Sequence, residues 1–279
     1  METIGLVGCG LLGSALAARF IEAGYGVLGY DVEPARLREL EAAGGRAAGS
    51  VEEVARACGR VMLVLPNSDV TAGLLECFPP GGTLIDATTG DPEQIAGFGR
   101  ELAARGVRYL DATVGGSSKQ TRAGDVTVMC GGEREVFDAS AALLGTFARQ
   151  AFYMGPWGSG ARMKLVNNLV LGLNRAVLAE GLRFARACGI DPAMALPVLQ
   201  AGPAWSRAMD VKGEKMLRED FTPEARLSQH LKDVRLILAE GARRGAKLPL
   251  SELHRTLLER AEAAGYGAAD NSAVIKAFD

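Results

Sequence analysis

The sequence predicts an N-terminal α/β domain with a mainly parallel sheet, followed by an all-α domain built on one long interdomain helix. Three observations support this fold class. Short β-branched runs alternate with amphipathic stretches in the first part of the chain, as in repeated strand, helix, strand units. Residues 1–160 hold 27 of the 36 glycines, and the prolines stop between Pro156 and Pro192, where apolar residues recur at helical spacing. We therefore expect domains at 1–157 and 158–279.

The pattern in the first part of the chain predicts strands separated by helices. Each expected strand is a short apolar run bounded by turn-forming residues. Pro34 and Pro92 lie where the first turn of a helix tolerates proline. The expected strands are 3–8, 26–31, 60–65, 83–86, 107–114, 126–131 and 151–154, and the expected helices are 11–23, 34–43 and 92–105.

The pattern in the second part of the chain predicts helices throughout. A helix from about residue 160 to 188 would be about 40 Å long and would form the spine between the domains. Further helices are expected around 192–200, 224–245, 249–264 and 270–277. A long apolar helix beside a small helical domain would leave apolar surface exposed in a monomer, so we expect a homodimer or homotetramer.

The composition narrows the class of protein. With 279 residues, of which 48% are hydrophobic and 23% charged, the chain can bury a sizeable core. A net charge of -2 with scattered Lys and Arg gives no basic face, so neither nucleic acid nor an anionic membrane is an expected partner. Five separate cysteines and two histidines indicate reduced thiols, no metal site and a cytoplasmic protein. No apolar run approaches the ~18 residues of a membrane span.

A glycine-rich turn near the N-terminus predicts a Rossmann fold that binds a dinucleotide. Its glycines form GxGxxG between a strand and a helix, where they permit a tight turn, close approach of a pyrophosphate and helix–strand packing. The helix start adds free N–H groups and a positive dipole end. Asp31 ends the next strand and can accept hydrogen bonds from an adenine ribose, which favours NAD, although Arg36 and Arg38 keep NADP possible. The cofactor-binding residues expected here are Gly8, Cys9, Gly10, Leu11, Leu12, Gly13 and Asp31.

Further segments resemble a known family. Residues 111–132 (DATVGGSSKQTRAGDVTVMCGG) are similar to DAPVSGG…AGxLTxMVGG, 158–168 (GSGARMKLVNN) to GxGxxxKLxNN, and 232–239 (KDVRLILA) to KDLxLA. Residues 65–68 (LPNS) and 86–89 (DATT) are similar to the MLP and DxST loops. These motifs occur in the same order in the β-hydroxyacid dehydrogenases, the 3-hydroxyisobutyrate dehydrogenase family. The resemblance implies an NAD(P)-dependent oxidoreductase that transfers hydride between nicotinamide and a small 3-hydroxy acid or its semialdehyde.

Lys164 is the expected general acid–base. It follows a glycine-rich turn at the start of the long helix, where burial and the positive helix end both disfavour its charged form. Asn168 lies one turn further on the same face and can support it. The family assigns the same two roles to these positions. The resemblance further implies substrate contacts from Gly115, Gly116, Ser117, Ser118, Asn167 and Lys232, and cofactor contacts from Leu65, Pro66, Thr89 and Lys232.

The chain departs from the family pattern in the substrate loop. Gly115 stands where the family usually has a substrate-contacting serine, and Ser117 replaces the last glycine. Either the hydroxyls of Ser117 or Ser118 replace the lost one, or the pocket takes a different substrate. Two alternatives therefore stay open: an NADPH-dependent aldehyde or semialdehyde reductase of the same family, which Asp31 opposes, and a catalytically silent NAD-binding scaffold, which Lys164 opposes.

Overall fold

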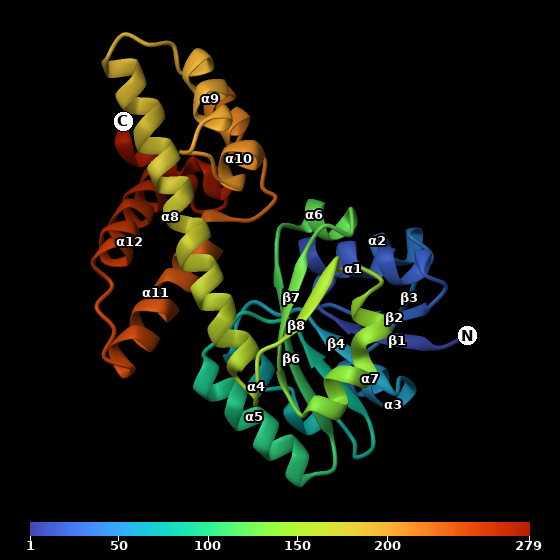
Figure 1. Ribbon diagram of the computed structural model, residues 1–279. Helices are drawn as coiled ribbons and strands as arrows, with labels where there is room; N and C mark the ends of the chain where they lie inside the picture. The colour runs from blue at the N-terminus through green and yellow to red at the C-terminus, as the bar shows by residue number, and fades with distance from the viewer. The chain divides into compact units, whose positions relative to one another are not determined.

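The computed structural model describes residues 1–279 and divides into two compact units, Met1–Lys164 and Leu165–Asp279. The first unit holds an eight-stranded sheet in the order β3-β2-β1-β4-β5-β6-β7-β8 (Figure 1). All neighbouring strands are parallel except β6 and β7, so the mainly parallel sheet is confirmed. The strands are β1 (Thr3–Val7), β2 (Gly26–Tyr30), β3 (Arg46–Ala47), β4 (Arg60–Leu63), β5 (Thr83–Asp86), β6 (Arg108–Gly115), β7 (Thr127–Gly132) and β8 (Gln150–Tyr153).

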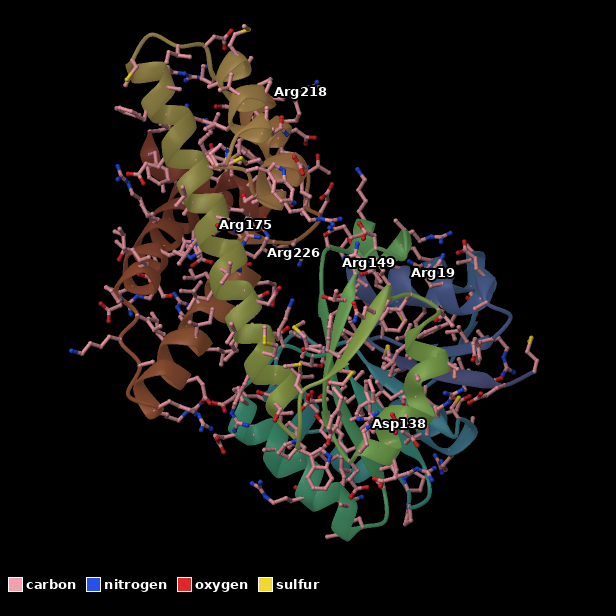
Figure 2. The ribbon with its side chains drawn as sticks, in the orientation of Figure 1. Arg19, Asp138, Arg149, Arg175, Arg218 and Arg226 are labelled. Atoms are coloured by element: carbon pink, nitrogen blue, oxygen red, sulfur yellow. The ribbon has the colours of Figure 1, made fainter.

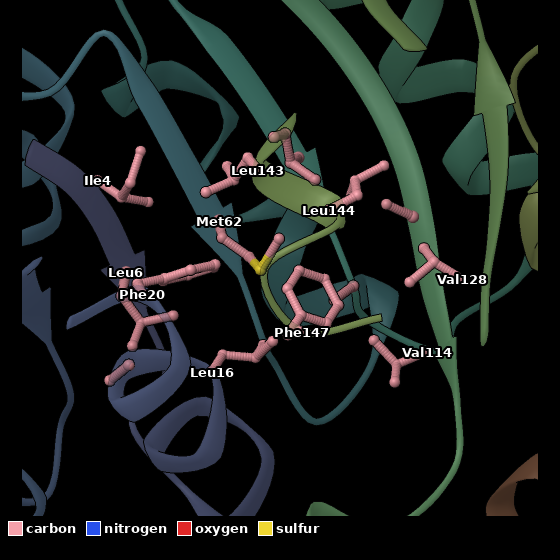
Figure 3. Close-up of a cluster of buried hydrophobic side chains, with 14 of the residues drawn as sticks. Ile4, Leu6, Leu16, Phe20, Met62, Val114, Val128, Leu143, Leu144 and Phe147 are labelled. Atoms are coloured by element: carbon pink, nitrogen blue, oxygen red, sulfur yellow. The ribbon is translucent and has the colours of Figure 1, made fainter. Parts of the chain in front are cut away.

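Helices cover both faces of this sheet, which is why its inner strands are buried almost without interruption, whereas the edge strands β3 and β8 are partly exposed. One hydrophobic cluster joins Leu16 and Phe20 of the first helix to Met62 in the sheet and to Leu143 and Leu144 (Figure 3). A second cluster covers the other face with residues of α3 and α5. The helices of this unit are α1 (Leu11–Glu22), α2 (Pro34–Ala42), α3 (Val51–Ala57), α4 (Ser68–Ala72), the 3-10 turn η1 (Leu75–Cys77), α5 (Pro92–Ala104), α6 (Ser118–Arg122) and α7 (Arg134–Leu144).

The second unit is entirely helical. The long helix α8 (Ser159–Ala187) begins in the first unit and continues into the second, where Arg175 is buried on it (Figure 2). Leu178 and Leu182 of α8 pack in a core with Leu231 and Leu258. No helix is both long enough and apolar enough to cross a membrane. The other elements are α9 (Pro192–Ala201), α10 (Arg207–Arg218), α11 (Leu227–Arg243), α12 (Pro249–Ala261), the π-helical turn η2 (Glu262–Tyr266) and the 3-10 segment η3 (Asn271–Phe278).

The C-terminal segment differs from the expectation of a helix at 270–277. It is a 3-10 helix that starts after Asp270, whose Oδ1 accepts the Ser272 N–H at 3.0 Å. Asp270 is itself fully buried and pairs with Lys212 at 3.0 Å. Nearly every residue of the segment is buried, so packing and this buried ion pair determine its conformation rather than helix propensity.

Candidate active site

The turn after β1 has the backbone geometry that a pyrophosphate requires. Gly8 has φ +93, and a Cβ there would overlap the Val64 carbonyl oxygen. A Cβ at Gly13 would overlap the carbonyl oxygen of Gly8, so both positions need glycine. A Cβ at Gly10 would meet nothing within 4 Å, and no side chain caps α1. The first N–H groups of α1 therefore face open space, and the site fits the phosphates of a dinucleotide.

Asp31 is held beside this turn. Its Oδ2 accepts the Cys9 N–H at 2.6 Å, and its Oδ1 accepts the Glu33 N–H at 2.9 Å. Burial, and then the charge of Asp31, raise the pKa of the Cys9 thiol to about 12. Cys9 is therefore a neutral packing residue of the turn, and the local negative charge is that of the Asp31 carboxylate.

The loops that follow β4 and β5 are joined to each other at the same edge of the sheet. Thr88 Oγ1 accepts the Leu65 N–H at 3.1 Å, and the Thr88 N–H donates to Asp86 Oδ1 at 2.9 Å. Asp86 is buried and also accepts the Tyr109 hydroxyl at 2.9 Å. This network places the loops containing Pro66 and Thr89 at the carboxyl ends of the strands, where doubly wound sheets bind ligands.

Lys164 lies at the end of β6 on this same edge. Its side chain is 8% exposed, and its Nζ donates to the Val114 carbonyl oxygen at 2.6 Å. Because β1, β4, β5 and β6 are parallel neighbours, β6 lies three strand spacings, ~14 Å, from β1 across the sheet, and it continues beyond Asp111, the residue in register with Val7 at the end of β1. An extended dinucleotide can cover that distance along the edge.

Asp111 anchors the start of α8, a role that sequence reasoning missed. Its Oδ2 accepts the Gly158 N–H, and Thr113 Oγ1, two residues along β6, donates to the Gly160 carbonyl oxygen at 3.2 Å. Burial raises the pKa of Asp111 to about 7, against the opposing effect of the backbone N–H groups around it. The conspicuous signal in the sequence was an Asp within a mostly apolar strand.

In the substrate loop, Ser117 is the N-cap of α6. Its Oγ accepts the Gln120 N–H at 3.3 Å, and the Gln120 side chain accepts the Ser117 N–H at 2.9 Å, which makes a capping box. Gly115 and Gly116 precede it at the end of β6. A Cβ at Gly116 would come within 2.5 Å of Val126 Cγ1.

The second unit brings the other expected polar residues together around Asp233. Asn168 is 5% exposed, and its Nδ2 donates to Asp233 Oδ2 at 2.8 Å. Lys232 Nζ lies 3.1 Å from Asp233 Oδ1, and Asn167 Nδ2 donates to Asn168 Oδ1 at 3.1 Å. Asp233 thus orients Asn168, which lies four residues after Lys164 on α8.

Comparisons with known proteins identify the family of the chain. Residues 3–155 match the model for the NAD binding domain of 6-phosphogluconate dehydrogenase. Residues 158–278 match the model described as NAD-binding of NADP-dependent 3-hydroxyisobutyrate dehydrogenase. The chain is 30% identical over 284 residues to 2-(hydroxymethyl)glutarate dehydrogenase of Eubacterium barkeri, covering 99% of this chain and 94% of the relative.

The chain belongs to the β-hydroxyacid dehydrogenase family. Within this family it is also 28% identical over 283 residues to glyoxylate/succinic semialdehyde reductase 1 of Arabidopsis thaliana, covering 98% of this chain and 97% of that one. A solved 3-hydroxyisobutyrate dehydrogenase from Salmonella typhimurium superposes with a TM-score of 0.91 at 25% identity and covers 99% of each chain. The protein is accordingly an NAD(P)-dependent oxidoreductase with a 3-hydroxyisobutyrate dehydrogenase-like fold.

Proposed function

We propose that this β-hydroxyacid dehydrogenase acts on a small 3-hydroxy acid or its semialdehyde, with Lys164 as the general acid–base. When bound, the nicotinamide cofactor accepts or supplies the hydride. Lys164 Nζ takes the hydroxyl proton as the carbonyl forms and returns it in the reverse direction. The observation that carries the proposal is the buried Lys164 amino group, whose Nζ lies 2.6 Å from the Val114 carbonyl oxygen at the edge that bears the cofactor turn.

The remaining residues orient the reactants. Asn168, fixed by Asp233, supports the proton transfer, and Lys232 supplies a fixed positive charge for the substrate carboxylate. The glycine-rich turn and its helix hold the pyrophosphate, while Leu65, Pro66 and Thr89 contact the nicotinamide half. Gly115, Gly116, Ser117, Ser118 and Asn167 line the substrate. The relatives named above, a hydroxy acid dehydrogenase and a semialdehyde reductase, support this substrate class.

The cofactor we propose is NAD, because the Asp31 carboxylate would repel a 2′-phosphate. Arg36 pairs with Glu39 at 2.8 Å, so its charge is already partly balanced and does not favour NADP strongly. The reductase relative favours a second candidate, an NADPH-dependent semialdehyde reductase. The ratio of kcat/KM for the two cofactors separates these two functions.

Three further parts of the proposal concern the whole chain. The two family models end at 155 and begin at 158, which supports domains at 1–157 and 158–279. The five cysteines form no disulfide, which supports a reducing, cytoplasmic compartment. An apolar stripe along α8 supports a homodimer or homotetramer; it consists of Val166, Val170, Val177 and Phe184, each more than half exposed.

Substitution of Lys164 tests the chemistry. In Lys164→Ala we expect kcat to fall by about 10²–10⁴ while the Kd for NAD stays within about twofold, because a general acid–base acts only in the reaction step. The measurement is nicotinamide absorbance with a panel of small 3-hydroxy acids and semialdehydes, plus NAD titration by fluorescence. Lys247→Ala, at an exposed loop position, is the control and should behave as wild type. Retained turnover in Lys164→Ala removes the role assigned to Lys164, and NAD binding without turnover of any compound by wild type indicates the scaffold.

A further inference from the structure

The end of β6 next to Lys164 carries no side chain of its own. Lys164 Nζ donates to the carbonyl oxygen of Val114, and the next two residues are Gly115 and Gly116. A substrate that reaches Lys164 therefore meets bare backbone along this part of β6. Any side-chain hydrogen bond to it from this part of the sheet must come from the neighbouring strand.

That neighbour is β7, and its first residue is Thr127. Gly115 and Thr127 are direct cross-strand partners in the antiparallel pair. A Cβ at Gly115 would lie 2.9 Å from Thr127 Oγ1, so the threonine hydroxyl stands beside the volume that a side chain at position 115 would fill. Because residue 115 is glycine, the Thr127 hydroxyl can extend from β7 toward β6.

The Thr127 hydroxyl faces the side of the sheet on which α8 begins. Residues 113 and 115 point to the same face of β6, and a cross-strand partner shares the face of its pair. Thr113 on that face donates from Oγ1 to the carbonyl oxygen of Gly160, in the first turn of α8. The hydroxyl of Thr127 is thus on the face that carries the start of the helix bearing Lys164.

The Thr127 hydroxyl also has no hydrogen-bond partner within the chain, and the residue is half-buried. By contrast, the Thr113 hydroxyl is shared between two carbonyl oxygens, and the Thr121 hydroxyl donates to the Ser117 carbonyl oxygen at 3.0 Å. The oxygen of Ser117 is engaged in capping α6. A hydroxyl donor without a partner, on the face of the sheet where α8 begins, can bind a ligand.

We propose that Thr127 is a specificity-determining residue. Its hydroxyl donates a hydrogen bond to a carboxylate oxygen of the substrate, while Lys164 exchanges a proton with the reacting oxygen. The inference rests on the proposed function, since it takes the substrate to be a small hydroxy acid or its semialdehyde. Thr127 then selects acids over the corresponding neutral alcohols and aldehydes, because a site with a donor for that group loses more when the group is absent.

The test compares Thr127→Val, which keeps the shape but removes the donor, with Thr127→Ser, which keeps the donor. Hydrogen bonds to charged groups contribute enough that KM for the acid should rise about tenfold to a hundredfold in Thr127→Val. We expect kcat and the Kd for NAD to change by less than about threefold, and Thr127→Ser to remain close to wild type. The KM for a neutral analogue without the carboxylate should be the same in Thr127→Val and wild type.

The chain offers a matched control at the amino end of the parallel strands, opposite the end near Lys164. Thr3 on β1 pairs with Gly26, and a Cβ at Gly26 would lie 2.9 Å from Thr3 Oγ1, the same arrangement remote from Lys164. Thr3→Val should leave KM unchanged. Thr127→Ala should show the same rise in KM as Thr127→Val, and the double variant Gly115→Ser/Thr127→Ala, in which alanine makes room for the new side chain, should reverse most of it.

The outcomes separate this inference from the proposed function. If wild type turns over hydroxy acids and Thr127→Val keeps its KM, or raises KM equally for acid and neutral analogue, the Thr127 inference is wrong and the function stands. If Thr127→Val loses NAD binding as well, its role is structural and the inference is wrong. If wild type turns over no compound, the proposed function fails and this inference fails with it.

Discussion

At the scale of single residues, the structure turns several sequence signals into specific hydrogen bonds. Asp31 is the clearest case, because two backbone N–H groups hold its carboxylate beside the glycine-rich turn. A carboxylate fixed in this way cannot swing away from a 2′-phosphate, so we expect it to favour NAD through charge repulsion as well as through hydrogen bonds to the ribose.

Removing that charge should shift cofactor preference. In Asp31→Asn we expect kcat/KM for NADP relative to NAD to rise about tenfold or more, which corresponds to roughly 1.4 kcal/mol of repulsion. Steady-state kinetics with both cofactors measures the ratio. Glu33→Gln, which removes an equal charge from the same turn, should leave the ratio unchanged. An equal shift in both variants would show a general field effect and would remove the selecting role from Asp31.

At the scale of elements, α8 carries the proposed catalytic residues, and three contacts restrain its first turns. Asp111 binds the Gly158 N–H, Thr113 binds the Gly160 carbonyl oxygen, and Lys164 binds back to Val114. Further along α8, Gly172 leaves room for two histidines. A Cβ there would overlap His230 Nε2 and lie 2.6 Å from His254 Cε1.

Two glycines of α8 should therefore respond in opposite ways to alanine. Replacing a helical glycine normally stabilises by about 0.5–1 kcal/mol. Gly181 has nothing within 4 Å of its Cβ position, so Gly181→Ala should follow this rule. Gly172→Ala should instead destabilise by about 1–3 kcal/mol, because the methyl group displaces the packed histidine rings. Urea denaturation gives both values, and stabilisation by Gly172→Ala would contradict the described packing.

At the scale of the whole molecule, the two units contain buried groups whose ionisation responds to pH in opposite directions. Burial raises the pKa of Asp111 to about 7 in the first unit. Burial, and then the charge of Arg175, lower the pKa of His254 to about 4 in the second unit. Burial therefore favours the neutral form of both groups. Asp111 becomes neutral by binding a proton as pH falls, and His254 becomes neutral by losing a proton as pH rises.

The contributions of these groups to stability follow from linkage. The Asp111 contribution is complete below its unfolded pKa of 3.8 and is lost as pH rises through 7, whereas that of His254 is complete above 6.5 and is lost as pH falls through 4. From pH 6.5 to 5, acidification should stabilise the first unit through Asp111 and destabilise the second through His254, each by at most about 1.4 kcal/mol per pH unit.

Thermal unfolding followed by tryptophan fluorescence can separate the units, because Trp157 lies in the first and Trp205 in the second. In single-tryptophan backgrounds, Asp111→Asn should remove the gain of the first unit at lower pH. His254→Gln should remove the loss in the second unit. Identical pH slopes in wild type and in both variants would show that these groups do not determine the dependence.

A second prediction for the whole molecule concerns the apolar stripe on α8 and the assembly of copies of the chain. If it is the interface between copies of the chain, Val177→Glu/Phe184→Glu should convert a homodimer or homotetramer to a smaller species, because two charges would be buried without partners. Light scattering after size exclusion at micromolar concentration measures the mass. Val32→Glu, at a 79% exposed position in the first unit, is the control. A monomeric wild type would overturn the proposed assembly.

Local patterns in the sequence were sufficient for much of the fold. The alternation of apolar runs and helices predicted the parallel sheet, and the long helix was expected at 160–188 and lies at Ser159–Ala187. The helices α4 and α6 were missed, because each has five residues and shows no periodicity, and the 12-residue α10 was missed as well. Helices as short as α4 and α6 depend on caps, for example Asn67 and Ser117, and on packing.

By itself, the sequence determined the fold class, the dinucleotide turn with Asp31, and the candidate residues Lys164 and Asn168, because each of these is encoded within one local segment. Only the tertiary structure decided what those residues contact. The bonds from Lys164 to Val114, from Gly158 to Asp111 and from Asn168 to Asp233 join residues 50, 47 and 65 positions apart. No local pattern specifies such pairs, because strand order and helix packing bring them together.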